Sequence, residues 1–340
     1  MAFQATAKKW TEIRPAVARG LRKGISGFWW VLKILVPISF FTLLLDFSGL
    51  LGRMDGLLTP VMGLLSLPPA AALPLIVGLL TGIYGAVAAM AVLPLTPDQM
   101  TLIAIFLLIS HGLPVETMVQ AKSGIRPFKA AAFRLSASVL TVLAAARFLN
   151  PATTVSGDAA ATAATQTAFW PTLADWALST GALVLQILAI VTAIMVTLEL
   201  LKVFQLLPAL LRVLTPVLRL MGLDRRVGML WLTAGLFGIA YGGAVIVEEA
   251  RESGLDEQSL TRLHLSIGIN HAMIEDPALF LPLGIGAFWL WVPRLIAAIV
   301  AVRLLDLWNW AARRRAERRS GRWLRTGKGE ISSEKVAGKT

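Results

Sequence analysis

The sequence has no cysteine and few charged residues, and both shortages narrow what the protein can be. Without cysteine there are no disulfides, thiolate metal sites, iron–sulfur clusters or cysteine nucleophiles. Only 15% of the residues are charged, whereas 56% are hydrophobic and the mean hydropathy is +0.71, which is too apolar for a soluble chain of 340 residues. This composition predicts a polytopic membrane protein.

Four stretches are nearly free of charge, and each is close to the roughly 20 residues that cross about 30 Å of hydrocarbon. They are Phe28 to Leu45, Ala71 to Leu93, Trp176 to Thr197 and Val227 to Val247. We interpret each of them as a membrane span. The basic start of the chain runs into the first span without a small-residue cleavage site, so we expect that span to remain in the mature protein.

The chain contains an internal duplication. The segment LTPDQMTLIAIFLLISHGLPVE, from Leu95, aligns without a gap with LDEQSLTRLHLSIGINHAMIED, from Leu255, 160 residues later. Three polar pairs match in this register: His111 with His271, Glu116 with Asp276, and Arg134 with Arg294. Polar pairs inside apolar segments rarely match by accident, so we predict two copies of one membrane unit.

Charge placement predicts how the two units are oriented. With both termini cytoplasmic and three crossings in each unit, 26 of the 32 Lys and Arg residues lie inside, as the positive-inside rule requires. Arg262 and the acidic cluster between Glu248 and Glu257 then lie outside. Because three is an odd number, the second unit is upside down. Inverted repeats of this kind are the building plan of many secondary transporters.

The predicted fold is all-α and has five parts. A basic amphipathic arm (1–27) precedes repeat 1 (28–150), an Ala- and Thr-rich external linker (151–175) leads to repeat 2 (176–308), and a basic cytoplasmic tail (309–340) follows. Each repeat is predicted to contain about three spans, an amphipathic helix and a broken re-entrant hairpin. Contact with anionic lipid explains the basic tail more simply than binding of nucleic acid does.

Two broken segments carry most of the polar residues. The first, Asp98 to Gln120, has about twelve apolar residues before its glycine and proline, too few to cross, so we predict that it enters the membrane and returns. The second is Asp256 to Phe280. Non-helical backbone at membrane depth needs protein or water to satisfy its amides, which predicts a polar cavity between the repeats. The predicted lining residues are Ser110, His111, Glu116, Asn270, His271, Glu275 and Asp276.

A structural alternative stays open for these residues, which is that they only cap broken helices or pair with arginine. Arg134 and Arg294 are predicted charge partners of a hairpin acid or of an anionic solute group. Tyr84 and Tyr241 lie in glycine-rich stretches, which favours helix packing first and a secondary solute contact second.

The sequence favours neither a cofactor nor an enzyme, because the broken segments contain no GxSxG or HExxH motif. We expect no bound metal either. The weak alternative is a set formed by His264, His271 and Glu275, whose spacing of seven and four residues puts all three on one helical face. Ala104 occupies the position of His264 in the first unit.

The pattern GIYGAVA…LPLT…QM…SHGLPVET…K and its second copy GIAYGGAVIVEEA…GL…INHAMIED resemble the nucleoside-recognition, or Gate, domain family. That family includes spore-maturation membrane proteins and is distantly similar to the membrane part of ferrous-iron permeases and to concentrative nucleoside transporters. The resemblance covers most of Phe28 to Leu305, although the cysteines of the iron permeases are absent. It implies the fold, and it implies that the broken segments form the site.

We therefore predict a secondary transporter or permease for a small polar or anionic solute, nucleoside-like by the resemblance, in the bacterial inner membrane with both termini cytoplasmic. We expect any coupled proton to be carried by His111 or His271, because an imidazole titrates near neutral pH. Two alternatives stay open: a non-transporting membrane assembly or regulatory protein of the spore-maturation type, and a divalent metal permease. The sequence leaves the solute, the coupling ion and homo-oligomer formation undecided.

Overall fold

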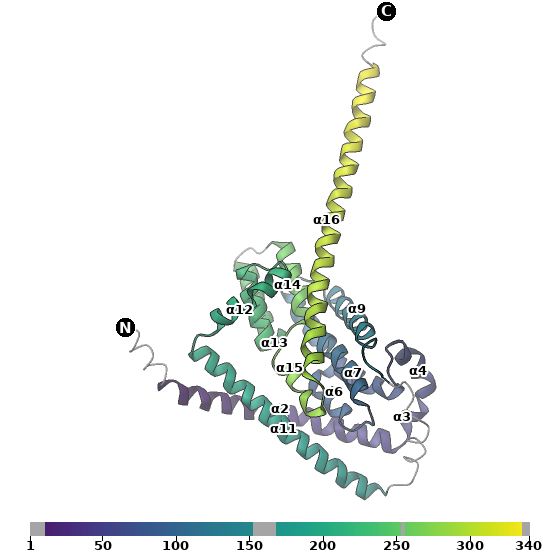
Figure 1. The fold of residues 1–340 in the computed structure, drawn as a ribbon, viewed down its shortest axis with the longest axis vertical. Coiled ribbons are helices and arrows are strands. Elements are labelled where there is room, and N and C mark those ends of the chain that lie inside the picture. The colour runs from purple at the N-terminus through teal and green to yellow at the C-terminus, as the bar shows by residue number, and fades with distance from the viewer. Residues whose placement is uncertain (1–10, 152–167, 253–255, 335–340) are drawn as a thin grey trace, which may run out of the picture.

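The computed structural model describes residues 11–151, 168–252 and 256–334, and all regular structure in these ranges is helical (Figure 1). Most of the predicted linker lies outside them. The first half contains α2 (Ile13–Phe47), α3 (Leu50–Arg53), α4 (Asp55–Leu64), η1 (Pro69–Ala71), α5 (Ala72–Thr81), α6 (Ile83–Met90), α7 (Pro97–Ser110), α8 (Leu113–Lys122) and α9 (Pro127–Ala145). The second half contains α11 (Phe169–Val203), α12 (Leu207–Leu220), α13 (Arg225–Glu252), α14 (Glu257–Ile269), α15 (Glu275–Ala278), η2 (Leu281–Leu283) and α16 (Ala287–Glu334).

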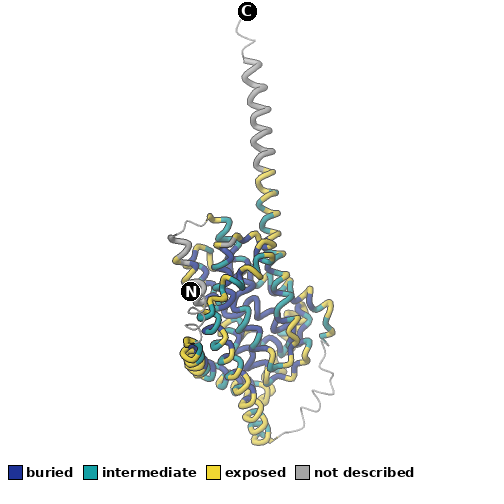
Figure 2. Tube along the Cα trace, turned by 60° about the vertical axis from the view of Figure 1, so that its left-hand side comes forward, coloured by how far each residue is buried: buried dark blue, intermediate teal, exposed yellow. Residues whose placement is uncertain are grey.

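Five of the described segments are long and apolar enough to cross a membrane: α2, α7 with α8, α9, α11 and the first part of α16. This confirms the prediction of an all-helical chain with several spans. Large apolar side chains such as Trp29, Leu178 and Phe288 are exposed on the outer helices, as expected for a surface that faces lipid. The segment Pro97–Lys122 is different, because 67% of its most apolar 18-residue stretch is buried, against 22–33% of the corresponding stretch in the other four. Residues 101–110 are all buried, and buried residues fill the centre of the molecule (Figure 2).

The backbone repeats the duplication seen in the sequence. Positive φ angles are uncommon outside glycine, so their positions mark the fold of a chain. Ten described residues have them, and they form five pairs: Gly49 with Gln205, Ser66 with Gly222, Gly82 with Gly238, Gly112 with Ala272, and Gly124 with Gly284. The spacing is 156 residues in the first three pairs and 160 in the last two. The two units therefore share their turns and breaks, apart from a four-residue insertion.

Gly82 turns the chain back between α5 and α6. A Cβ atom on Gly78 would lie 2.9 Å from Cβ of Ala86, eight residues later, whereas those positions are about 12 Å apart along one straight helix. The helices therefore form a short hairpin, which small residues allow to close. In α13, Gly238 interrupts the helix with a matching φ of 77°. The sequence predicted single spans here, and the structure corrects this because glycine tolerates a backbone that ends a helix.

The first polar segment, in contrast, does not turn back. Asp98 at the start of α7 accepts a hydrogen bond from the backbone of Asn150, just beyond the end of α9, at 3.1 Å. Its other end, Lys122, lies five residues before the start of α9 at Pro127. The α7 and α8 helices therefore run the whole length of α9. The prediction of a re-entrant hairpin was wrong because the break uses only two residues, an extended His111 and a left-handed Gly112.

The second polar segment follows the same course along α16. Near its start, Arg262 forms an ion pair with Asp306 on α16, with 2.8 Å between Nη2 and Oδ1. Its last element, η2, leads directly into the beginning of α16. The sequence placed Arg262 on the opposite side of the membrane from the region after Arg303, and this ion pair shows that both lie at one end. Next to it, a hydrogen bond from Ser259 to the carboxylate of Asp256 caps α14 and lowers the pKa of this exposed acid.

The first helices of the two units, α2 and α11, lie antiparallel (Figure 1). Gly20 faces Val196 and Gly24 faces Thr192, so closely that an added Cβ would lie 2.5 and 2.7 Å from the backbone Cα atoms of those residues. The hydroxyl groups of Ser39 and Thr180 are 3.3 Å apart further along the pair. Helix α2 includes part of the predicted arm, and α16 continues through most of the predicted tail, so neither is a separate domain.

Candidate functional site

The two helix breaks meet in the buried centre of the molecule. His111 follows α7 and His271 follows α14, and their ring centroids are 4.9 Å apart. Each break is tied to the preceding glycine-interrupted segment of its own unit. The backbone amide of Gly112 donates to the carbonyl of Gly78 at 3.0 Å, and that of Ala272 donates to the carbonyl of Ala234 at 3.1 Å. The repeated architecture therefore brings the paired histidines together.

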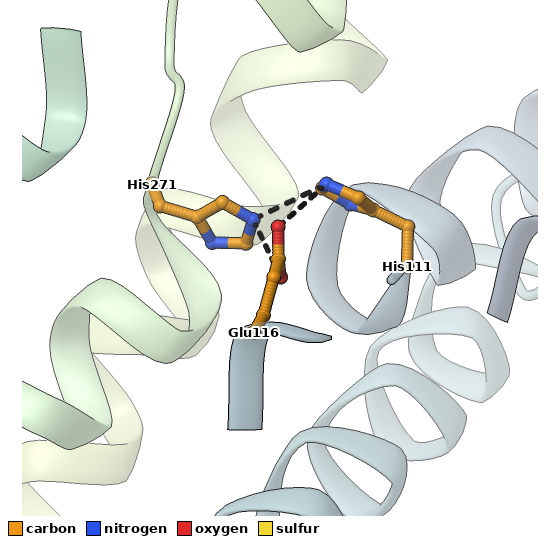
Figure 3. A group of neighbouring side chains, drawn as sticks. All are labelled: His111, Glu116 and His271. Atoms are coloured by element: carbon orange, nitrogen blue, oxygen red, sulfur yellow. Dashed lines mark hydrogen bonds and ion pairs between the residues drawn. The ribbon is translucent and has the colours of Figure 1, made fainter. Parts of the chain in front are cut away.

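Two acids complete what we call the His–acid cluster, formed by His111, Glu116, His271 and Asp276. Glu116 lies in the first turn of α8 and Asp276 in α15. His111 Nε2 lies 3.2 Å from Glu116 Oε1 and 3.4 Å from Asp276 Oδ2. His271 Nε2 lies 3.3 Å from Glu116 Oε2 (Figure 3). It lies 4.0 Å from Asp276 Oδ2. The cluster thus contains a histidine and an acid from each unit.

Both imidazoles are held in a defined tautomer. Nδ1 of His111 is 2.8 Å from the carbonyl oxygen of Leu107, and Nδ1 of His271 is 3.0 Å from that of Ile267. A carbonyl only accepts, so Nδ1 carries the hydrogen and Nε2 of a neutral ring has a lone pair. The two Nε2 atoms are 3.4 Å apart. The two lone pairs of neutral rings therefore face each other, which calls for a proton or a metal ion between them.

Two buried arginines support the breaks. Arg134 donates to the carbonyls of Ile109 and His111, at 2.8 and 2.9 Å, and pairs with Glu116 at 2.7 Å. Arg294 Nη2 donates to the carbonyl of Ile269 at 2.8 Å and to that of His271 at 2.7 Å. Cations are favoured at these helix ends because the last carbonyls have no helical partner. The predicted pairing of Arg134 with an acid is therefore present, whereas Arg294 shows no ion pair among the described residues.

The other predicted lining residues take different roles. Ser110 bonds to the carbonyl of Phe106 within its own helix, at 2.8 Å. Glu275 accepts a 2.5 Å hydrogen bond from the hydroxyl of Tyr84 in the other unit, so Tyr84 does more than pack. Asn270 is fully buried, and neither side-chain atom has a hydrogen-bond partner among the described residues. The side chain of Tyr241 lies outside the part that the structure describes.

The metal set considered from the sequence is directed to separate partners. His264 Nε2 lies 3.3 Å from the carbonyl of Ser123, and Glu275 bonds to Tyr84. A different set converges within the described residues: the ligand atoms of His111, Glu116 and His271 all lie within 4.8 Å of one another. Spacing along one helix could not reveal it, because the residues come from both units. The only sequence signal was the gapless register that matched the two histidines.

Sequence reasoning did not single out Trp291. Its indole nitrogen donates to the carbonyl of Met273 at 2.7 Å and so fixes the backbone of the second break. Nothing in the apolar context of this tryptophan signalled the role. A surface pocket of about 430 Å³ is also present, but none of its lining residues belongs to the cluster: Leu211, Arg212, Thr215, Leu218, Arg219, Leu223 and Asp224.

Comparison with known proteins agrees with this architecture. Residues 28–126, which include His111 and Glu116, match the Gate family model, described as nucleoside recognition. The resemblance inferred from the motifs is therefore confirmed for residues 28–126. The uncharacterized membrane protein YvoD of Bacillus subtilis (strain 168) is 29% identical over 283 residues, which cover 83% of this chain and 91% of that protein. No solved structure matches the chain. The protein is a multi-pass membrane protein, and its residues 28–126 are similar to the nucleoside-recognition family.

Proposed function

We propose that the protein is a secondary transporter, or permease, for a small polar solute, and that the His–acid cluster is its binding site. The observation that carries this proposal is the meeting of imidazole and carboxylate groups from both units at two buried helix breaks. Ionisable groups inside a membrane protein are costly, by roughly 3 kcal/mol each on insertion scales, and they usually mark a pathway or a site. Broken helices at a repeat interface are the usual binding element of such transporters.

An inverted arrangement of the two units supports alternating access. The first unit contains three candidate spans, α2, α7 with α8, and α9, and the second contains two, α11 and α16. We infer that α14 and α15 make a third crossing in the second unit, because this segment leads from the ion pair between Arg262 and Asp306 to the beginning of α16. This odd number reverses the second unit, and the antiparallel course of α2 and α11 agrees. The segment predicted as a span, Ala71 to Leu93, forms a hairpin, and the segment predicted as a hairpin, Asp98 to Gln120, continues without turning back. The number of crossings in the unit therefore stays at three. With both termini cytoplasmic in a bacterial inner membrane, the basic ends of the chain satisfy the positive-inside rule.

Three buried polar groups without hydrogen-bond partners among the described residues favour a polar solute. They are the amide of Asn270 and the Nη1 atoms of Arg134 and Arg294. Buried polar groups are normally satisfied, so unpaired ones near a site are candidates for ligand contacts. The amide offers both a donor and an acceptor, and the guanidinium groups suit an anionic substituent. A nucleoside-like solute, as named by the family description, carries no anionic substituent, but its base and sugar offer hydrogen-bond donors and acceptors for the amide and acceptor atoms for the arginine N–H groups.

Cysteine accessibility tests whether the centre opens to water. The chain has no cysteine, so Ser110→Cys and Asn270→Cys each introduce a single thiol. Both side chains are fully buried in the structure, so labelling by a membrane-impermeant maleimide needs a second conformation in which the cluster is open. We expect both thiols to react in vesicles. We also expect millimolar uridine or adenosine to slow the reaction.

Two positions on α9 and just after it serve as controls. Leu140→Cys, which is 67% exposed on the outer surface of α9, should stay unlabelled because it faces lipid. Asn150→Cys, exposed just beyond the helix, should react from one side of the membrane. Protection of both central thiols, while Asn150→Cys reacts, would overturn the transporter assignment. That outcome would favour a closed membrane assembly or regulatory protein of the spore-maturation type.

Uptake of radiolabelled uridine and adenosine by proteoliposomes tests the solute class. We expect uptake above that of empty liposomes, and its loss in the double variant His111→Ala/His271→Ala. His264→Ala is the matched control, because this histidine contacts the Ser123 carbonyl and lies outside the cluster. Uptake that survives in the double variant would remove the cluster from the transport pathway.

A further inference from the structure

We propose that the His–acid cluster binds one divalent transition-metal ion of the Zn²⁺ type. The ligands are Nε2 of His111, Nε2 of His271 and the carboxylate of Glu116, with Asp276 as the fourth. The inference adds to the proposed function by naming an ion for the same site. It rests on the proposed function only where it gives this site a role in transport.

The distances within the cluster are those of a tetrahedral site. Metal–ligand bonds of about 2.0–2.1 Å place tetrahedral ligand atoms about 3.3–3.4 Å apart. The two Nε2 atoms are 3.4 Å apart. Glu116 oxygens lie 3.2 and 3.3 Å from the two histidine nitrogens, and Asp276 Oδ2 lies 3.4 Å from His111 Nε2. The distance from Asp276 Oδ2 to His271 Nε2 is longer, at 4.0 Å. The spacing of these nitrogen and oxygen atoms therefore suits ligands that share one metal ion.

The groups behind the ligands are arranged as a metal site requires. A histidine that binds metal through Nε2 usually donates its Nδ1 hydrogen to a carbonyl or carboxylate, which fixes the ring. His111 and His271 both do so, each to the carbonyl four residues earlier. Arg134 Nη2, 2.7 Å from Glu116 Oε2, orients the carboxylate in the same way. Both imidazoles therefore present free lone pairs in fixed directions.

The unpaired oxygen of Asp276 also favours a metal ion over a shared proton. One proton between the two Nε2 atoms would satisfy only that contact. It would leave Asp276 Oδ2 buried, where this atom has no hydrogen-bond partner among the described residues. A metal ion between the rings would contact this oxygen as well as both Nε2 atoms. Two imidazole ligands also select Zn²⁺, Co²⁺ or a similar ion over Mg²⁺ and Ca²⁺, which prefer all-oxygen sites.

Metal binding can be measured on the purified full-length chain in detergent, without a polyhistidine tag and after treatment with a chelator. Co²⁺ titration followed by visible absorption reports tetrahedral coordination, and competition with Zn²⁺ gives the relative affinity. The background is low because the chain has three histidines and no cysteine. We expect one metal per chain by elemental analysis. We also expect His111→Ala and His271→Ala each to weaken binding at least about 100-fold, since losing a ligand exceeds the roughly 10–100-fold effect of losing a group behind it.

His264→Ala is the matched control and should retain wild-type affinity. Where a cluster variant aggregates, His271→Gln replaces it, and the measurement is the rise in Tm on adding Zn²⁺. We expect this rise for the wild type and for His264→Ala but not for His271→Gln. Failure of the wild-type chain to bind Zn²⁺ or Co²⁺ would overturn the proposal without any variant, and so would binding that survives in the double histidine variant. Transport without metal binding would contradict this inference alone. Metal binding by a protein whose central cysteines are never labelled would contradict only the proposed transport.

Discussion

The two units build the same break in the same place but treat their acids differently. In the first unit, Glu116 pairs with Arg134 at 2.7 Å. In the second, Asp276 has one methylene fewer, and Arg294 makes contacts to carbonyls instead. The first unit therefore supplies an acid that is paired with its own arginine, whereas Asp276 and Arg294 form no ion pair with each other among the described residues. Duplication provided the scaffold, and divergence of single side chains made the centre asymmetric.

The breaks themselves also differ. In the first unit two residues separate α7 from α8, and α8 continues for ten residues. In the second, residues 270–274 separate α14 from α15, which has only four residues. Side-chain bonds from Trp291 and Tyr84 hold this looser break. We infer that the second break adapts more readily to a bound solute, because fewer helical hydrogen bonds fix its backbone.

The largest expected difference between the units concerns their arginines. Arg134→Leu removes the partner of a buried carboxylate and should cost about 3–5 kcal/mol of stability, because the charge of Glu116 is left uncompensated. Arg294→Leu removes hydrogen bonds to carbonyls and a longer-range attraction to Asp276 but breaks no direct ion pair, so it should cost less. Thermal unfolding in detergent, followed by tryptophan fluorescence, compares the two. The double variant Arg134→Leu/Glu116→Gln should recover part of the loss. Equal losses in the two single variants would show that the units are energetically alike.

A smaller effect is expected where the two units contact each other along α2 and α11. Gly20→Ala and Gly24→Ala place a Cβ against backbone atoms of α11 and should each destabilise the protein by about 1–3 kcal/mol. Gly27→Ala is the control in the same helix. No atom lies within 4 Å of its Cβ, so alanine should be neutral or stabilising through helix propensity. A similar Tm for all three variants would contradict the close antiparallel packing.

The smallest effect tests the left-handed residue at each break. Gly112 has φ 55° and Ala272 has φ 42°. Gly112→Ala should cost about 1 kcal/mol, because a Cβ is disfavoured in this conformation, and the added atom would meet only Glu116 at ordinary contact distance. Ala272→Gly should stabilise by up to about 1 kcal/mol for the converse reason. Opposite shifts in Tm are expected, and shifts of the same sign would show that the two breaks are not equivalent.

The site was largely predictable from the sequence because its polar residues stand out in apolar segments. The gapless register paired His111 with His271 and Glu116 with Asp276, and these four residues form the cluster. The register could not separate them from Ser110 and Glu275, which lie equally near the breaks but bond elsewhere. Rotamer and backbone direction decide that difference, and neither has a sequence signal.

Composition and pattern determined that this chain is a helical membrane protein with two related units, since hydrocarbon leaves few options for an apolar chain with unpaired amides. Tertiary structure decided which segments turn back. Sequence length favoured a span through Gly82 and a hairpin at Gly112, and the structure has the opposite at both glycines. The local signals are alike, a helix interrupted by glycine, and only packing against neighbouring helices chooses between turning back and continuing. The same packing brought the two histidines, 160 residues apart, to within 3.4 Å.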